Sequence, residues 1–174
     1  MPNNYWNEIN IYGDKETMPE LKNKIVREEG KGKDYKEHVD FEILLPMPKI
    51  LHRVISPVRD PIQVYELDEN GEFDQFKSKT RNANTEELKE INLYPYKDWY
   101  EWARHVWGTK WNAYDSVVEY DEKYGDLMIG FMTAWCPPKG WMNKVEELCK
   151  SMNFEYYHSG WDEDEQPRLL NKKP

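Results

Sequence analysis

The chain has little of what usually assigns a protein to a functional class. Among 174 residues it has two cysteines, Cys136 and Cys149, which are too few for a disulfide framework or a zinc cluster. No apolar run approaches the roughly 20 residues needed to cross a bilayer. The opening residues, MPNNYWNEIN, do not place a basic region before an apolar stretch. We therefore expect no signal peptide, no membrane association and a cytoplasmic location.

Catalytic and metal-binding motifs are also missing. The sequence contains no phosphate-binding loop, dinucleotide fingerprint, nucleophile elbow or EF-hand loop. The four histidines, His38, His52, His105 and His158, do not form a pattern of zinc ligands. We therefore expect no enzyme, no metal site and no cofactor, unless His105 and His158 meet in the folded chain.

Charge and aromatic content are what the sequence has in excess. The net charge is −9, the mean hydropathy is −1.00, and yet 14% of the residues are aromatic, with 8 Trp and 12 Tyr. Disordered chains are poor in aromatic residues, so we expect a charged surface around an aromatic core. The negative charge disfavours binding to a phosphate backbone, which depends on clustered Lys and Arg. A protein partner is favoured instead.

The first half of the chain predicts a β-α-β opening. Alternation predicts a strand over 5–12, and a capping-box pattern from Thr17 to Glu20 predicts a helix over 18–29. A second strand is expected over 38–45, ended by prolines. Residues 49–95 are interpreted as an insertion or long connection, with a short helix over 84–91 capped by Asn84 or Thr85.

The second half predicts a β-β-α-β arrangement after one more helix. That helix, over 96–107, has a tryptophan-rich face and a glycine in the C-cap position. The remaining predicted elements are strands over 111–121 and 126–135, a helix over 139–152 and a strand over 153–159. The order predicts an α+β fold: a ferredoxin-like antiparallel sheet with helices on one face. Residues 1–160 would form this single domain, and 161–174 a charged tail.

Aromatic residues around the join between the predicted helix 96–107 and the next strand form the candidate binding site. Aromatic rings interleaved with a lysine can grip a partner or stack bases, or they can form a corner of the core. Cys136 has two interpretations as well, as an activated nucleophile before a helix or as an inert thiol. Asp115 is either a buried acid or base, or an exposed carboxylate. The candidate binding residues are Trp107, Lys110, Trp111, Tyr114, Asp115 and Trp135.

A family resemblance lies in the same region. The run YPYKDWYEWARHVWGTKWNAYD, preceded by LPMPKIL and followed by FMTAWCPP, resembles the YubB ferredoxin-like domain family, a group of phage, prophage and plasmid proteins of undetermined activity. The resemblance implies a ferredoxin-like fold, an origin in a mobile element and a location in the cytoplasm of a bacterial host. It implies no catalytic residues.

Two functions follow as hypotheses. The first is a non-catalytic binding protein of a phage or mobile element that acts through protein–protein contacts, with inhibition of a bacterial antiviral defence system as one specific form. A negative surface can occupy a site that normally holds nucleic acid. The alternative is a single-stranded nucleic-acid-binding module like the RNA-recognition fold, whose strand aromatics stack bases. The oligomeric state is not predicted.

Overall fold

The computed structural model describes residues 3–162. The predicted charged tail lies outside these residues, apart from its first two positions. The chain divides into two compact units. The first contains residues up to Pro46 and from Val106 onward, and the second is Met47–His105. Within the described part of the chain, no helix has the length and apolar character needed to cross a membrane.

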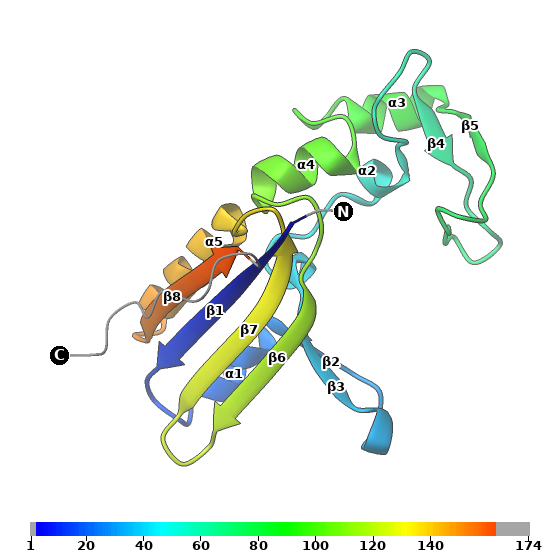
Figure 1. Ribbon diagram of the computed structural model, residues 1–174. Helices are drawn as coiled ribbons and strands as arrows, with labels where there is room; N and C mark the ends of the chain where they lie inside the picture. Colours follow the sequence, from blue (N-terminus) through cyan, green and yellow to red (C-terminus); the bar gives the residue numbers. More distant parts are fainter. Residues whose placement is uncertain (1–2, 163–174) are drawn as a thin grey trace. The chain divides into compact units, whose positions relative to one another are not determined.

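A four-stranded antiparallel sheet forms the centre of the first unit (Figure 1). Its strands are β1 (Asn4–Tyr12), β6 (Tyr114–Asp121), β7 (Asp126–Ala134) and β8 (Glu155–Asp162), in the order β6-β7-β1-β8. The predicted α+β class and antiparallel sheet are confirmed. All four strands lie within three residues of their predicted bounds. Alternation of apolar and polar residues indicated β1, and apolar residues on both faces indicated β7 as a central strand.

Two helices cover one face of this sheet, α1 (Met18–Asn23) and α5 (Lys139–Ser151) (Figure 1). The core lies between them and the inward side chains of β1 and β7. Each aliphatic side chain fully buried here contributes about 1.5–3 kcal/mol relative to an exposed one. The largest fully buried side chains of this layer include Ile9, Ile11, Met18, Leu21, Phe41, Leu127, Ile129, Phe131 and Trp141.

The predictions for 18–29 and 38–45 were wrong in part. The helix α1 ends at Asn23, and Thr17 makes no capping hydrogen bond from its side chain. Residues Val26–Glu29 instead form β2, which pairs with β3 (Lys36–Val39) in a two-stranded hairpin. Phe41–Ile43 then forms a 3-10 turn rather than a strand. That turn is capped by Asp40, whose Oδ1 accepts from the Glu42 N–H, and a side-chain cap of this kind competes with continued strand pairing.

The second unit is built from small elements. They are α2 (Lys49–Arg53), β4 (Gln63–Tyr65), β5 (Thr80–Asn82), α3 (Thr85–Ile91) and most of α4 (Trp99–Val106). The predicted helix over 84–91 is confirmed: Asn84 Oδ1 accepts from the Glu86 and Glu87 N–H groups at 2.9 Å. The helix predicted over 96–107 begins later, because Asp98 caps it by accepting from the Glu101 N–H at 2.8 Å.

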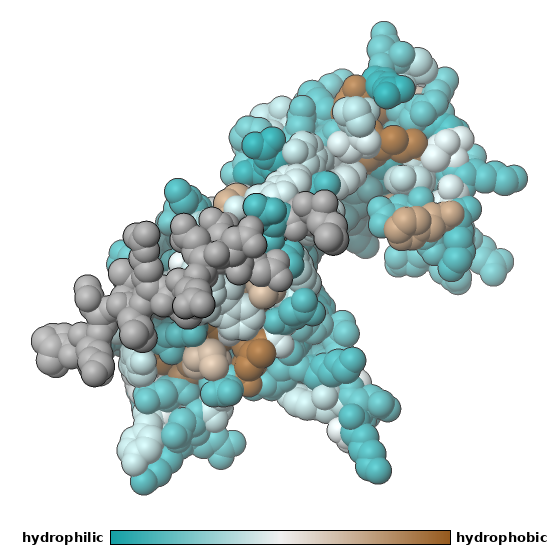
Figure 2. Space-filling model, in the orientation of Figure 1, coloured by the Kyte–Doolittle hydropathy of each residue, from teal (hydrophilic) through white to brown (hydrophobic). Residues whose placement is uncertain are grey.

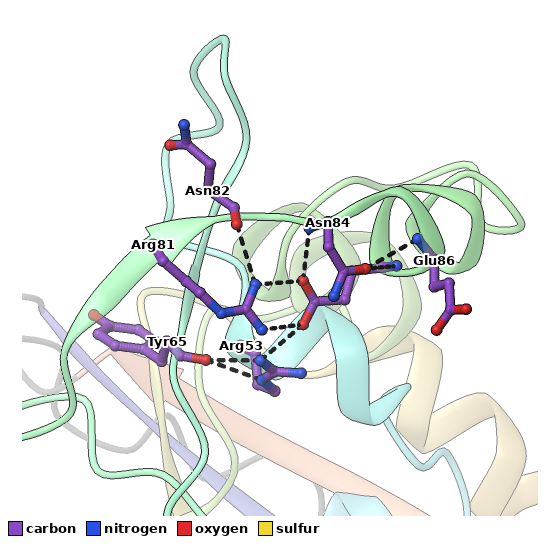
Figure 3. A network of polar contacts seen from close by, with 7 residues as sticks. Arg53, Tyr65, Arg81, Asn82, Asn84 and Glu86 are labelled. Carbon is purple, nitrogen blue, oxygen red and sulfur yellow. Dashed lines mark hydrogen bonds and ion pairs between the residues drawn. The ribbon is translucent and has the colours of Figure 1, made fainter.

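A buried carboxylate joins three elements of the second unit (Figure 3). Glu87 on α3 accepts two hydrogen bonds from Arg81 at 2.7 and 2.8 Å and one from Arg53 at 3.0 Å. Arg53 also donates to the carbonyl of Tyr65, at 2.9 and 3.0 Å. The bonds from Arg81, the Asn84 N–H and the charge of Arg53 lower the pKa of Glu87 to about 2 against the cost of burial. This network fixes α2, α3 and the β4–β5 hairpin to one another.

Candidate functional site

Trp107 is a core residue. It is 4% exposed, its Nε1 donates to the Leu45 carbonyl at 2.9 Å, and its ring meets Phe41 edge-on at 5.7 Å between centroids. The backbone carbonyl of Trp107 accepts from the Trp141 N–H at 3.2 Å. A side chain held in this way has no surface to offer a partner. Trp107 is therefore removed from the candidate binding residues.

Trp111 and Trp135 lie at the surface, and Lys110 joins them. The two residues are 38% and 46% exposed. The Lys110 Nζ lies 4.4 Å from the centroid of Trp111 and 5.3 Å from that of Trp135. Both distances fall within the range of cation–π attraction. The structure thus brings together three of the predicted binding residues in one exposed cluster, called the tryptophan cluster below.

The tryptophan cluster is carried by well-bonded backbone. The buried hydroxyl of Thr109 donates to the Ala134 carbonyl at 3.0 Å, and the Trp135 N–H donates to the Asn3 carbonyl at 2.8 Å. On the other side of Trp111, the side chain of Asn112 accepts from the Phe41 N–H and donates to Asp40. A rigid support lowers the entropy lost when an exposed ring binds a partner.

Two of the predicted residues have strained backbone. Trp135 has φ +70° and Asp115 has φ +49°, in the left-handed region that costs a residue with a Cβ roughly 1–2 kcal/mol. Asp115 lies at an irregularity of β6 where the pairing with β7 shifts register between Tyr114 and Val117. Its carboxylate is exposed, so the buried acid-or-base interpretation of Asp115 is wrong. Strain of this kind at an exposed tryptophan is typical of functional sites.

No helix of the described residues covers the second face of the sheet, which we call the outer face (Figure 1). Strand register places its side chains in rows that run across the sheet. At one end of the sheet the row is made of aromatic and methionine side chains. The Trp6 indole lies over Gly130, so closely that a Cβ on residue 130 would come within 2.4 Å of the indole. The Tyr114 hydroxyl donates to Asn4 at 2.7 Å at this end. The row consists of Tyr114, Met132, Trp6 and Trp161.

The opposite end of the outer face is acidic. Register places carboxylates there and along the face, and among its described residues there is no Lys or Arg. Two rings, Tyr12 and Tyr157, meet at 5.8 Å between these carboxylates. Figure 2 shows the molecule in the orientation of Figure 1, and on the visible surface hydrophilic residues surround a few hydrophobic ones. The carboxylates are Glu8, Glu119, Asp121, Asp126 and Glu155.

A hollow of about 770 Å³ opens at the acidic end. Glu119, Glu122 and Asp126 line it, together with Tyr12 and Met128. Lys123 also lines the hollow, and its Nζ lies 4.6 Å from the ring centroid of the adjacent Tyr124. Across the described residues no group of His, Cys, Asp or Glu has the geometry to hold a metal ion.

The outer face went undetected at the level of sequence. Its polar and aromatic residues, among them Trp6, Glu8 and Tyr157, alternate with core residues, so each strand indicated only that one side is polar. Which polar residues share a row depends on strand pairing, which a single sequence does not reveal.

Cys136, Cys149 and His105 each make contacts within their own unit. Cys136 is exposed and donates from Sγ to the Gly108 carbonyl at 3.3 Å. Cys149 is buried on α5, and burial raises the pKa of its thiol to about 12. His105 stacks on Tyr96 at 4.8 Å and bonds through Nδ1 to the Glu101 carbonyl. These contacts give Cys136, Cys149 and His105 structural roles in the fold.

Comparison of the chain with protein-family models, with curated proteins and with solved structures finds no match.

Proposed function

We propose that the protein is a non-catalytic binding protein of a phage or mobile element, with a ferredoxin-like domain of the YubB kind, that acts through protein–protein contacts. The fold supports this proposal through its order β1-α1-β6-β7-α5-β8. Numbering those four strands in sequence order gives the spatial order 2-3-1-4, all antiparallel. A β-α-β-β-α-β unit with helices on one face is typical of ferredoxin-like domains.

The tryptophan cluster carries the proposal. Tryptophan is one of the residue types most enriched at the binding hot spots of protein interfaces. Trp111 and Trp135 are exposed, and the Lys110 ammonium lies within cation–π distance of both rings. The strained φ of Trp135 adds a cost to folding that a ring with no function would not justify.

Inhibition of a bacterial antiviral defence protein is one specific form of this function. A protein that acts on nucleic acid contacts the phosphate backbone through Lys and Arg, so a groove that binds nucleic acid is basic. The net charge of −9 and the carboxylates of the outer face are complementary to such a groove.

A second candidate function is a single-stranded nucleic-acid-binding module, favoured by aromatic residues on an open sheet face. Trp6, Trp161 and Tyr114 lie on that face as base-stacking rings would. The five carboxylates there oppose a phosphate backbone. A fluorescence titration with mixed single-stranded oligonucleotides at low salt separates the two functions, because a saturable quench would favour the nucleic-acid module.

The test of the proposed function uses variants that remove the rings without unfolding the chain. Trp135 has a backbone φ of +70°, which glycine adopts without strain, so Trp135→Gly removes the ring and the backbone strain together. Trp111→Ala removes a ring that is 38% exposed. The matched control is Tyr35→Ala, which removes a ring 46% exposed in the segment between β2 and β3.

Tagged wild-type protein and the three variants are used for affinity capture from bacterial lysate, with quantitative mass spectrometry. We expect one or a few proteins enriched with wild type and with Tyr35→Ala, and lost by at least tenfold with Trp111→Ala and Trp135→Gly. Equal enrichment with all four proteins, or none with wild type, contradicts the proposal.

A further inference from the structure

The outer face and its hollow suggest the chemistry of the partner. In the part of the chain that the structure describes, no helix covers this face, since α1 and α5 lie on the other side of the sheet (Figure 1). Its partly exposed side chains include five carboxylates and, among the described residues, no cation. A face of one sign of charge selects a partner of the opposite sign.

We propose that the outer face docks a basic, extended segment of the partner protein, with an arginine or lysine side chain entering the hollow at the acidic end. This proposal rests on the proposed function and specifies the partner's chemistry. The bound segment would run along the sheet from the row of Tyr114, Met132, Trp6 and Trp161 to the hollow. Its apolar residues would meet Trp6 and Met132, and its cation would meet Glu119 and Asp126.

The hollow has the groups that a cationic side chain requires. Glu119 and Asp126 come from neighbouring strands, and Glu122 comes from the turn between them, so the carboxylates surround the opening from two sides. The Tyr12 ring in the wall supplies an aromatic surface on which a guanidinium stacks. The volume of about 770 Å³ is larger than one arginine side chain needs, which leaves room for the backbone of the segment.

Among residues 3–162, no Lys or Arg side chain pairs with the carboxylates of this site. Lys123, at the edge of the hollow, contacts the Tyr124 ring, and the five face carboxylates have no ion pair with a described Lys or Arg at 4.0 Å or less. Nucleic acid is disfavoured as the occupant because its phosphates would face the same carboxylates. A basic protein segment is therefore the occupant that the charges favour.

The test uses two fluorescein-labelled synthetic peptides of equal length, one alternating arginine with threonine and one alternating glutamate with threonine. Binding is followed by fluorescence anisotropy at low and at physiological ionic strength. The face variant is Glu119→Gln/Glu122→Gln/Asp126→Asn. The matched control removes the same charge from the helices that cover the other side, as Glu20→Gln/Glu146→Gln/Glu147→Gln.

We expect saturable binding of the arginine peptide and none of the glutamate peptide. The face variant should bind the arginine peptide about tenfold more weakly, because several surface ion pairs together contribute about that factor. The helix variant should bind within about twofold of wild type. Equal weakening in both variants would mean binding by overall charge alone, and this overturns the proposal, as does the absence of saturable binding to wild type.

Sedimentation of the wild type and the face variant, without peptide, tests the other occupant. A dimer that the face variant dissociates would place a second copy on the outer face and overturn the proposal. A single monomeric species in both supports it. If the arginine peptide fails to bind while capture from lysate still depends on Trp111 and Trp135, this proposal fails and the proposed function stands.

Discussion

Replacing Glu87 with glutamine removes the carboxylate that holds Arg53 and Arg81 together in the second unit (Figure 3). Its pKa is about 2, against a usual value of 4.5. At about 1.36 kcal/mol per pH unit, this difference corresponds to about 3 kcal/mol of folding stability at neutral pH. We expect Glu87→Gln to lower the free energy of unfolding of the second unit by about that amount at pH 7.

The pH dependence of this effect has a definite sign. A carboxylate whose pKa is lower in the folded state stabilises the fold above its unfolded pKa, and the stabilisation is lost as the pH falls through the folded pKa. The difference between wild type and Glu87→Gln should therefore be constant above about pH 5, and it should shrink to about 1 kcal/mol near about pH 2.5. Urea unfolding followed by tryptophan fluorescence at a series of pH values measures it.

Glu86→Gln is the matched control, because Glu86 is an exposed neighbour on the same helix with the same formal charge. We expect it to change the free energy of unfolding by less than about 0.5 kcal/mol at any pH. Equal effects of Glu86→Gln and Glu87→Gln at pH 7, or a Glu87→Gln effect that does not change with pH, would refute the electrostatic account of the network.

Three further predictions follow from burial and contact. Trp107→Ala should lower the free energy of unfolding by about 3–5 kcal/mol, and Trp111→Ala by less than about 1 kcal/mol, because Trp107 is buried and Trp111 is partly exposed. Chemical denaturation measures both, and equal shifts of the midpoint in the two variants would contradict this difference in burial. Ellman's reagent should titrate one thiol in the native protein, Cys136, and a second, Cys149, only after unfolding, whereas two fast thiols would place Cys149 at the surface. Gly130→Val should displace the indole that lies 2.4 Å from the site of the new Cβ and destabilise the sheet by about 1–3 kcal/mol, and an unchanged melting temperature would show that the indole does not lie over β7.

The sheet was the part of the fold most accessible from sequence. β1 alternates regularly, and β7 is apolar on both faces, as a central strand is. The helix predicted over 139–152 matches α5 closely because its apolar residues follow a clear helical period. The hairpin of β2 and β3 was missed because Arg27 to Glu29 are exposed charged residues without alternation. Ile25 also fits the helical period of α1, although the helix has already ended at Asn23. Such short elements depend on pairing partners elsewhere in the chain.

The candidate site could be predicted only as a region. Trp107 and Trp111 lie four residues apart in one aromatic run, and burial separates them because Leu45 and Phe41 enclose the first. Leu45 and Trp107 are 62 positions apart in the sequence, so only the folded chain shows that Leu45 contacts Trp107 rather than Trp111. The left-handed backbone of Trp135 was equally inaccessible, because left-handed φ values are expected at Gly or Asn rather than at Trp.

The most direct measurement of the central claim is the ratio of partner recovered by Trp135→Gly to partner recovered by wild type, in affinity capture from bacterial lysate with Tyr35→Ala alongside. The proposed function predicts a ratio of about one tenth or less, with Trp135→Gly as thermally stable as wild type. The Tyr35→Ala ratio should stay near one. A ratio near one for Trp135→Gly, in a protein that captures a specific partner, would show that the tryptophan cluster is not the binding surface.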